Sequence, residues 1–369
     1  MKARLLILRA GTGGSNNLIR SLRVGDPSLF IAGCHSDRFV LKKSPADRNY
    51  LTPPSTRREF PDALRHIIET EQIHLLIPNS DPDVKTISDL RDEIPCRLFL
   101  PRKAVIDLCQ DKFNLTTFLR SRGLPAPATY PVTHLDTIEE IFDRLAPNSR
   151  LWCRIRTGSD SMGAIPVKTP AQARSWISYW EEMRAVPSES FTLSEYLPGR
   201  SFACQSLWKN GKLILVKTYE RLSYFGGESR PSRASSIPAL AKIVVEPRLV
   251  ETSAEAIRAL DPNASGAFDV DLKDDAHGHG QITEINAGRL ISGTNLFDLT
   301  GKYNMAVTYV HLALDQPPAI DEPYDVAEDY YMLRDLDTLP GIFHADEFFD
   351  GILEATKLGT DFPGPVHNS

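Results

Sequence analysis

Gly266-Ala-Phe-Asp-Val-Asp271 and Thr283-Glu-Ile-Asn286 are the two stretches that decide the fold. In the first, Asp269 and Asp271 alternate with apolar residues, so a strand would project both carboxylates from one face. Glu284 and Asn286 repeat this alternation, and the turn-like run between the stretches lets them pair as a hairpin. Mg²⁺ is usually held by one or two carboxylates together with substrate phosphates. The hairpin therefore predicts a magnesium site, with a plain solvated hairpin as the alternative.

The composition excludes several classes of protein. With 369 residues, 41% of them hydrophobic, the chain can bury substantial cores, and its length suggests two or three domains. The net charge is −6 and basic residues are spread along the chain, unlike the clustered positive stripe of a nucleic-acid binder. Five scattered cysteines without a C-x-x-C pair indicate reduced thiols and a cytoplasmic location. The apolar run Leu5 to Leu8 is too short for a signal peptide or a membrane span.

Residues 1–108 alternate strand and helix patterns and predict a parallel α/β domain. The expected elements are strands at Leu5–Leu8, Leu29–Ile31 and Ile73–Ile77, and helices at about Asn16–Leu22 and Pro61–Gln72. The loop from Gly11 to Asn16 is close to the dinucleotide pattern G-x-G-x-x-G, but Asn16 replaces the third glycine and no acid stands out at the next strand end. We therefore disfavour NAD, although such a turn could bind another anion.

Different patterns follow this first domain. The expected elements are a helix over 111–122, strands over 151–156 and 164–168 around a small-residue loop, a helix to about residue 183, an antiparallel block from 191 with a hairpin at Asn210-Gly211, and a helix over 247–260. Gly123 and the prolines after it end the first of these helices. A C-terminal segment with a loose tail follows residue 316.

The order of these pieces resembles the ATP-grasp superfamily, in particular its carbamoyl-phosphate-synthetase-like branch of carboxylate–amine ligases. Four motifs occur in the family's order, and the resemblance spans nearly the whole chain. They are Asp111-Lys112 at the start of a helix, a basic strand before a small-residue loop, Glu195-Tyr-Leu-Pro-Gly199, and Glu284-Ile-Asn286.

The resemblance implies a fold of the α/β and α+β classes with antiparallel sheets in a two-lobed ATP-grasp domain. Its expected parts are an N-terminal α/β (pre-ATP-grasp) domain at 1–108, a central and lid lobe at 109–190, a C-terminal lobe with the adenine hinge and metal site at 191–315, and a C-terminal appendage with a tail at 316–369.

The resemblance also implies ATP and Mg²⁺ as cofactors, with Mn²⁺ as an alternative ion. The implied nucleotide-binding set is Lys112 and Arg154 for the phosphates, Gly158, Ser159, Ser161 and Gly163 in a flexible flap, and Glu195, Tyr196 and Leu197 in the adenine hinge. Arg154 stands where the family usually has lysine. Ser201 belongs to this nucleotide-binding set as well, although the family often has a ribose-binding carboxylate there, so Gln205 is an alternative for the ribose contact. Surface cations and an ordinary hairpin turn are the alternatives for these cations and this flap.

Asp271 and Glu284 match the family's two metal-binding acids, and Asn286 matches the adjoining amide. The family commonly has Pro-Arg directly after the asparagine, whereas two residues precede Arg289 here. Even so, the resemblance implies that Arg289 faces the transferring phosphoryl group and that Asn286 and Arg289 are catalytic. Asp269 shares the strand face but has no metal role in the family, so we expect it to support the metal acids or to be solvated.

The implied reaction is ATP-dependent activation of a carboxylate as an acyl-phosphate, followed by attack of an amine. The partners would be a small-molecule carboxylate and amine, with no nucleic acid or membrane, and the family implies a homodimer. Arg289, the loop at 226–233 and the loop at 292–295 are candidates to hold the substrate carboxylate, although the first loop could equally be a solvated insertion.

Two other functions stay open at the level of the sequence. One is a carbamate or carboxyphosphate kinase module, for which this chain has one module rather than two and no glutamine-hydrolysing segment. The other is a non-catalytic ATP-binding regulatory protein. Arg154, Ser201 and the shifted Arg289 favour the regulatory protein, whereas retention of Lys112 and the metal-site residues disfavours it.

Overall fold

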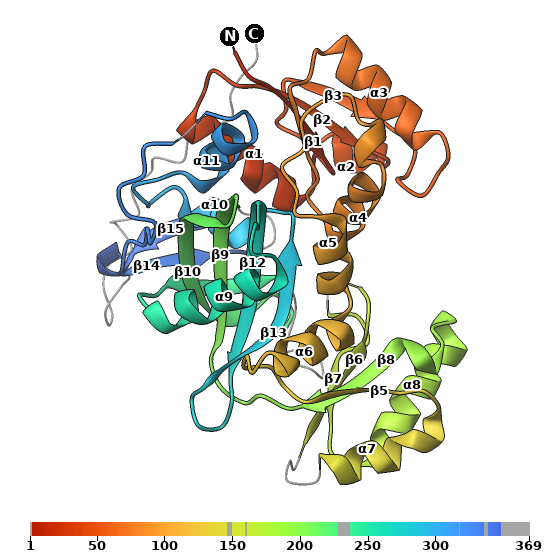
Figure 1. Ribbon diagram of the computed structural model, residues 1–369. Helices are drawn as coiled ribbons and strands as arrows, with labels where there is room; N and C mark the ends of the chain where they lie inside the picture. Colours follow the sequence, from red (N-terminus) through yellow and green to blue (C-terminus); the bar gives the residue numbers. More distant parts are fainter. Residues whose placement is uncertain are drawn as a thin grey trace, which may run out of the picture.

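The computed structural model describes residues 2–145, 150–158, 161–227, 237–316, 318–335 and 339–347. Figure 1 shows an N-terminal unit, a small lobe, and a large lobe built on a long sheet, with helices α5 and α6 running between them. Among the described residues, no helix combines the length and the apolar character that crossing a membrane requires.

The N-terminal unit is a parallel four-stranded sheet in the order β3-β2-β1-β4. Its strands are β1 (Arg4–Leu8), β2 (Phe30–His35), β3 (Arg48–Leu51) and β4 (Leu75–Ile77), and its helices are α1 (Gly13–Gly25), α2 (Arg38–Leu41), α3 (Phe60–Thr70), α4 (Asp81–Asp89) and α5 (Lys103–Gln110). Along β1, Leu5 and Ile7 enter one core and Leu6 and Leu8 enter another, because both sheet faces are covered. This confirms the predicted parallel α/β unit.

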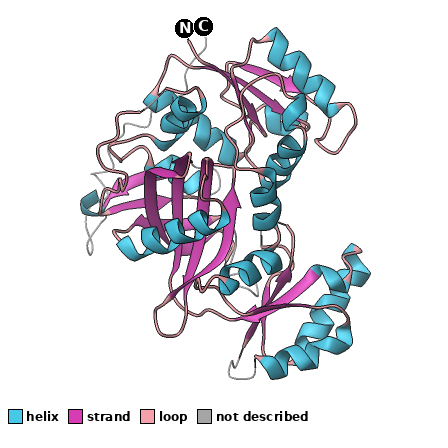
Figure 2. Cartoon of the chain, viewed as in Figure 1, coloured by secondary structure: helices cyan, strands magenta, loops and turns pink. Residues whose placement is uncertain are grey.

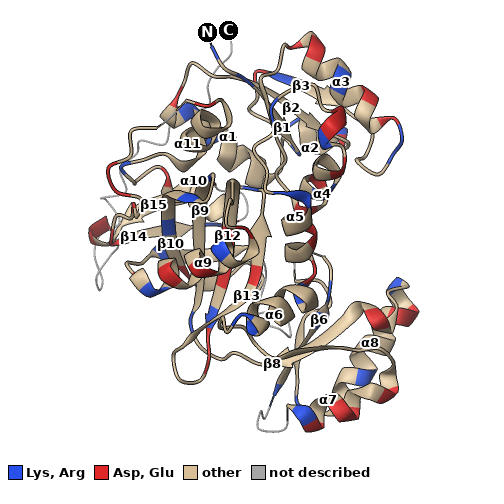
Figure 3. Cartoon of the chain, in the orientation of Figure 1, with Lys and Arg blue, Asp and Glu red and all other residues tan. Residues whose placement is uncertain are grey.

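The small lobe is an antiparallel four-stranded sheet in the order β5-β8-β6-β7. Helix α6 (Lys112–Ser121) leads into it, and its elements are β5 (Thr129–Pro131), α7 (Ile138–Arg144), β6 (Leu151–Ile155), β7 (Ile165–Val167), α8 (Pro170–Arg184) and β8 (Phe191–Glu195). Figure 2 shows α7 and α8 packed together beside this sheet. Acidic and basic side chains are mixed on these two helices (Figure 3), as in the ion pair of Arg174 with Glu139.

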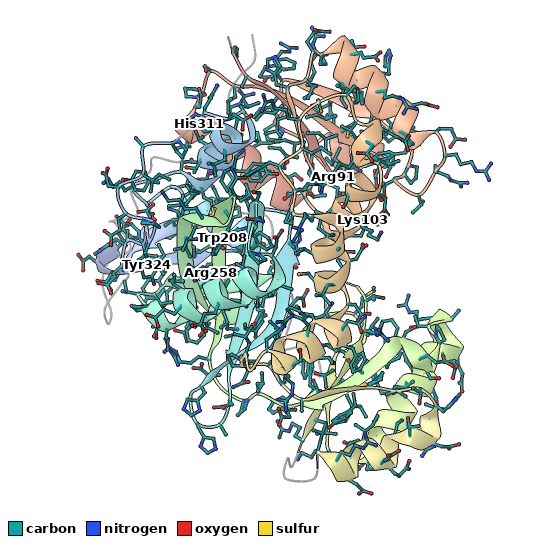
Figure 4. All side chains as sticks on the ribbon, viewed as in Figure 1. Arg91, Lys103, Trp208, Arg258, His311 and Tyr324 are labelled. Carbon is teal, nitrogen blue, oxygen red and sulfur yellow. The ribbon has the colours of Figure 1, made fainter. Side chains whose placement is uncertain are left out.

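The large lobe is a seven-stranded sheet in the order β13-β12-β9-β10-β11-β14-β15. The strands are β9 (Ser201–Lys209), β10 (Lys212–Tyr224), β11 (Pro238–Ile243), β12 (Gly266–Asp274), β13 (Gly280–Ala287), β14 (Tyr330–Leu333) and β15 (Gly341–His344), and the helices are α9 (Pro247–Leu260), α10 (Ser292–Phe297) and α11 (Met305–Ala313). Helix α9 covers the apolar face, where the Arg258 guanidinium lies 5.5 Å from the ring centroid of the buried Trp208 (Figure 4).

The strands of the two antiparallel sheets can be compared with the domain boundaries expected after residues 190 and 315, which remain a proposal. Strand β8 begins at Phe191 yet belongs to the small sheet, and β14 and β15 extend the large sheet although they lie beyond residue 315. The described part of the C-terminal segment is therefore built into the large lobe. The rest of the predicted tail, residues 348–369, lies outside the described residues.

The N-terminal unit and the large lobe share a core through α1. Leu18 and Leu22 of α1 belong to the same buried cluster as Met305 and Tyr309 of α11. Beside this cluster, Ser21 Oγ donates a hydrogen bond of 2.8 Å to the carboxylate of Asp298, across 277 residues of sequence.

Candidate active site

The hairpin of β12 and β13 has the register that the sequence predicts. Asp271 lies opposite Glu284, and Asp269 lies opposite Asn286. On its other edge β12 pairs with β9, where Asp269 lies opposite Gln205. Directly opposed residues of neighbouring strands point to the same face of a sheet, so these side chains share one face. The structure thus brings together the three residues predicted to hold a metal.

Two predicted phosphate-binding cations reach β13 from α6 and the small lobe. Lys112 Nζ lies 3.8 Å from Glu284 Oε1 and donates a hydrogen bond of 2.6 Å to the Gly158 carbonyl. Arg154 Nη2 donates to the Thr283 carbonyl at 3.1 Å. Burial lowers the pKa of Arg154, against the opposing influence of the Glu284 and Asp271 carboxylates. Buried cations without full partners are suited to an anionic ligand.

Arg221 of β10 is a site residue that the sequence analysis missed. Its guanidinium donates to the Asp271 carboxylate and, at 3.0 Å, to the Phe202 carbonyl. Burial alone would lower the pKa of Arg221, but the Asp271 carboxylate and other nearby groups hold it well above its usual value. The ion pair forms because β10 lies near β12 in the folded sheet, and no local sequence pattern predicts that these two strands are near each other.

Arg289 is held by a second missed residue, Asp81 at the start of α4. Arg289 Nε donates to Asp81 Oδ1 at 2.5 Å, and Nη2 donates to Asp81 Oδ2 at 3.3 Å and to Asn286 Oδ1 at 2.7 Å. Burial opposes the charge of Arg289, but the Asp81 carboxylate keeps its pKa above the usual range. The predicted catalytic pair, Asn286 and Arg289, is therefore in direct contact.

Asp269 is almost completely buried, with 1% of its surface exposed. Neither carboxylate oxygen has a hydrogen-bond partner among the described residues. Burial, followed by the nearby Asp271 carboxylate, raises the pKa of Asp269 to about 8. Solvation, one of the two roles expected for Asp269, is therefore wrong, because residues 289–291 cross this sheet face, where the opposing Gln205 side chain bonds their backbone.

The predicted adenine hinge continues from β8. Glu195 Oε2 accepts a hydrogen bond of 2.8 Å from the Ala128 backbone N–H, and the Arg150 guanidinium lies 4.9 Å from the Tyr196 ring centroid. Leu197 is buried. Glu195 thus has one carboxylate oxygen fixed by the backbone just before β5.

The side chain of Gln205 does not support the ribose contact expected from the sequence. Its amide donates to the Arg289 carbonyl at 3.0 Å and accepts from the Ile291 N–H at 2.9 Å, in a fully buried position. Ser201 accepts a hydrogen bond of 2.8 Å from the Tyr224 hydroxyl. Gln205 instead fixes the backbone on both sides of Leu290.

The predicted flap joins β6 to β7. Ser161 and Gly163 both have a positive φ, of 55° and 65°. A Cβ on Gly163 would lie 2.8 Å from Ile155 Cγ1, so this close turn requires glycine. Gly158 contributes the carbonyl that accepts from Lys112. Ser159 lies outside the described residues, as does most of the 226–233 loop considered as a substrate contact.

The donor set of this site fits a hard cation such as Mg²⁺. Nowhere in the described part of the chain do three or more His, Cys, Asp or Glu side chains form a metal-binding group. Asp271 and Glu284 offer two opposed carboxylates, and Mg²⁺ characteristically takes its other ligands from water and phosphate. Arg221 and Lys112 balance the charge of these acids here. Asp271 and Glu284, with Asn286, could therefore hold the ion.

No protein-family model and no curated protein sequence matches the chain. Solved structures do match it in fold. Biotin carboxylase from Campylobacter jejuni in complex with β-γ-ATP has a TM-score of 0.70 and 12% identity, covering 90% of this chain and 76% of its own. The biotin carboxylase domain of 2-oxoglutarate carboxylase from Hydrogenobacter thermophilus, with MgADP and bicarbonate, has a TM-score of 0.69 and 12% identity, covering 90% and 74%.

L-amino acid ligase from Bacillus licheniformis is a third similar structure, with a TM-score of 0.64 and 13% identity, covering 90% of this chain and 79% of its own. These similarities extend over all three parts of the molecule. The chain therefore has the ATP-grasp fold that the order of its sequence motifs predicts.

Proposed function

We propose that this protein is an ATP-dependent carboxylate–amine ligase that uses Mg²⁺ and forms an amide bond through an acyl-phosphate. The observation that carries the proposal is the meeting of opposite charges at β13. Lys112 and Arg154 reach this strand from α6 and the small lobe, next to the acids Asp271 and Glu284 of the large lobe. A triphosphate between the lobes would contact both sets, since cations neutralise its oxygens and acids hold its metal.

Each group then has a role set by its chemistry. Lys112 and Arg154 would bind phosphate oxygens, and the flap around Gly163 would exclude water. Asp271, Glu284 and Asn286 would hold Mg²⁺, which would supply positive charge against the negative charge that develops on the phosphates.

Two bond exchanges make up the proposed reaction. A substrate carboxylate oxygen attacks the γ-phosphorus, the bond to the ADP oxygen breaks, and ADP leaves. A neutral amine then attacks the acyl carbon, the carbon–phosphate oxygen bond breaks, and phosphate and a proton are released. Arg289, fixed by Asp81 and Asn286, would stabilise the transferring phosphoryl group. The protein's share is positioning, charge stabilisation and exclusion of water.

The similar structures support this proposal through what their own names state. They include an amino acid ligase and carboxylases crystallised with β-γ-ATP or with MgADP and bicarbonate. Bicarbonate is therefore a substrate to test beside organic acids. All five cysteines are unpaired, which is consistent with the cytoplasmic location that we propose. A homodimer stays part of the proposal, to be tested by light scattering.

The test measures ADP release with Mg-ATP against bicarbonate, amino acids and other small acids, each with and without amines. Glu284→Gln removes one metal acid, and Glu140→Gln is the matched control, since Glu140 is exposed on α7 and pairs with Arg144. We expect one acid and one amine together to stimulate ADP release in the wild type and in Glu140→Gln, and Glu284→Gln to abolish it. Tight ATP binding without stimulation by any combination would reject the ligase in favour of a regulatory protein.

A further inference from the structure

Arg334 follows β14, and its contacts differ from those of Arg221 and Arg289 on the same sheet face. Its backbone N–H continues the strand pairing by donating to the Ala239 carbonyl at 2.9 Å. Its guanidinium donates to the Ser292 hydroxyl. No carboxylate of the described residues forms an ion pair with it, whereas Arg221 has Asp271 and Arg289 has Asp81. Arg334 is partly buried, and a partly desolvated cation without an anion is unfavourable, so Arg334 is suited to an anion that arrives with a ligand.

The groups around Arg334 are polar and held in place. Ser292 Oγ also accepts a hydrogen bond of 2.9 Å from Asn17 Nδ2, so its own proton is free to donate elsewhere. The hydroxyl of Tyr219 lies against the same segment, since a Cβ on Gly293 would stand 2.5 Å from it. Arg334 and Arg221 both act on this Tyr219 hydroxyl electrostatically. These contacts place a hydroxyl-lined, positively charged position between β10, β14 and α10.

The strand order puts this position on the same sheet face as the metal acids. Met332 lies opposite Ala241, and Ala241 lies opposite Arg221, so these residues form one row across the sheet. Met332 packs in the cluster that contains Tyr219, and Arg334 is two residues further along. Four strand spacings separate β12 from β14, which is about 19 Å at about 4.8 Å each. The Arg334 guanidinium contacts Ser292 at the start of α10, beside Tyr219 of β10, the strand two spacings from β12.

The position lies at the end of the short segment that begins at Arg289, because Ser292 follows Arg289 by three residues and Gln205 fixes the backbone between them. In the proposed reaction the phosphates lie at β12 and β13, and the amine must approach the acyl carbon from the side that the nucleotide leaves open. We propose that Arg334 and Ser292 bind the carboxylate of the amine substrate, which is accordingly an amino acid or a peptide, and that they select it over amines without a carboxylate. This inference rests on the proposed ligase function and gives the segment after residue 315 a role in specificity.

The experiment compares each standard amino acid with its decarboxylated amine, such as L-alanine with ethylamine and L-serine with ethanolamine. We expect the wild type to prefer the amino acid. Arg334→Ala should raise the KM for the amino acid roughly 10- to 100-fold, because it removes a charge-assisted hydrogen bond. The KM for the decarboxylated amine and the affinity for ATP should not change. Arg334→Lys keeps the charge but not the planar fork, so it should retain part of the preference.

Arg20→Ala is the matched control, because Arg20 is an exposed arginine whose guanidinium donates to the Pro340 carbonyl of the same C-terminal segment. It should leave the preference unchanged. A preference that survives in Arg334→Ala, or a wild type that prefers amines without a carboxylate, would overturn the assignment.

Calorimetry separates this inference from the ligase proposal. L-alanine and ethylamine, and the other pairs, are titrated into the protein with Mg²⁺ and a non-hydrolysable ATP analogue. If the wild type turns over no substrate but binds an amino acid in an Arg334-dependent way, the carboxylate position stands and the ligase function falls. If turnover occurs but neither KM nor binding depends on Arg334, the carboxylate position falls alone.

Discussion

Replacing Asp81 with asparagine should weaken the link between the N-terminal unit and the large lobe, because Asp81 is the carboxylate partner of Arg289. The two side chains form two hydrogen bonds, at 2.5 and 3.3 Å, between residues 208 positions apart. Each side chain is 21% exposed. Asparagine keeps one acceptor oxygen and removes the charge, so the substitution isolates the electrostatic part of the contact.

The partial burial of this pair sets the size of the effect. Two unit charges about 4 Å apart interact by about 4 kcal/mol at an effective dielectric constant of about 20. Double-mutant cycles on exposed ion pairs give coupling free energies of about 0.2–1 kcal/mol. Removing one member of a buried ion pair lowers the stability by about 3–5 kcal/mol. With one fifth of each side chain exposed, we expect a coupling free energy of about 1.5–2 kcal/mol.

A double-mutant cycle with Asp81→Asn, Arg289→Gln and both together, measured by urea unfolding, tests this value. The control cycle uses the exposed pair Glu140 and Arg144 of α7, separated by 2.5 Å, for which we expect about 0.3–0.5 kcal/mol. A coupling between Asp81 and Arg289 no larger than the control would refute the reasoning. It would mean that Arg289 is oriented by Asn286 and by packing.

Three further changes have defined outcomes. Glu284→Gln should weaken Mg²⁺-dependent binding of an ATP analogue at least about 10-fold in calorimetry, since metal-site substitutions commonly have effects of that size or larger; equal affinity with and without the change would remove Glu284 from the metal site. Asp325→Asn should lower the free energy of unfolding by about 3 kcal/mol at pH 7. In the wild type the Asp325 carboxylate lies 2.9 Å from the ammonium nitrogen of the buried Lys217, and the substitution removes this nearest acid. Burial alone would raise the pKa of Asp325, but Lys217 holds it below its ordinary value of 3.8, so the stabilisation is present above that pH and the difference from wild type should vanish as the pH falls further. Gly293→Ala should lower the stability by about 1–3 kcal/mol through overpacking against the buried Tyr219, with partial recovery in Gly293→Ala/Tyr219→Phe, and an unchanged melting temperature would contradict the close contact.

Local periodicity was sufficient to predict the elements that carry the site. Alternation in a strand has a period of two and so predicts Asp269, Asp271 and Glu284 on one hairpin face, and the structure has that register. Strand β3 was not predicted, since most of its residues are exposed and lack such alternation. The helix predicted from Asn16 begins at Gly13, where Thr12 caps it.

Partners across the sheet could not be predicted in the same way. Arg221 can reach Asp271 because only β9 separates their strands. Asp81 contacts Arg289 because the N-terminal unit packs against the large lobe. Gln205 was expected near a ribose, but its buried amide bonds the backbone around Leu290. Such contacts depend on three-dimensional arrangement, and no motif of neighbouring residues encodes them.

The shared core of α1 and α11 has a consequence for the biosynthesis of this protein. The apolar side of α1, with Leu18 and Leu22, is covered by Met305 and Tyr309, which the ribosome adds almost three hundred residues later. Domains generally fold as units in the order of their synthesis. Here the first unit emerges with an uncovered hydrophobic side, so its folding can be completed only when nearly all of the chain has been translated.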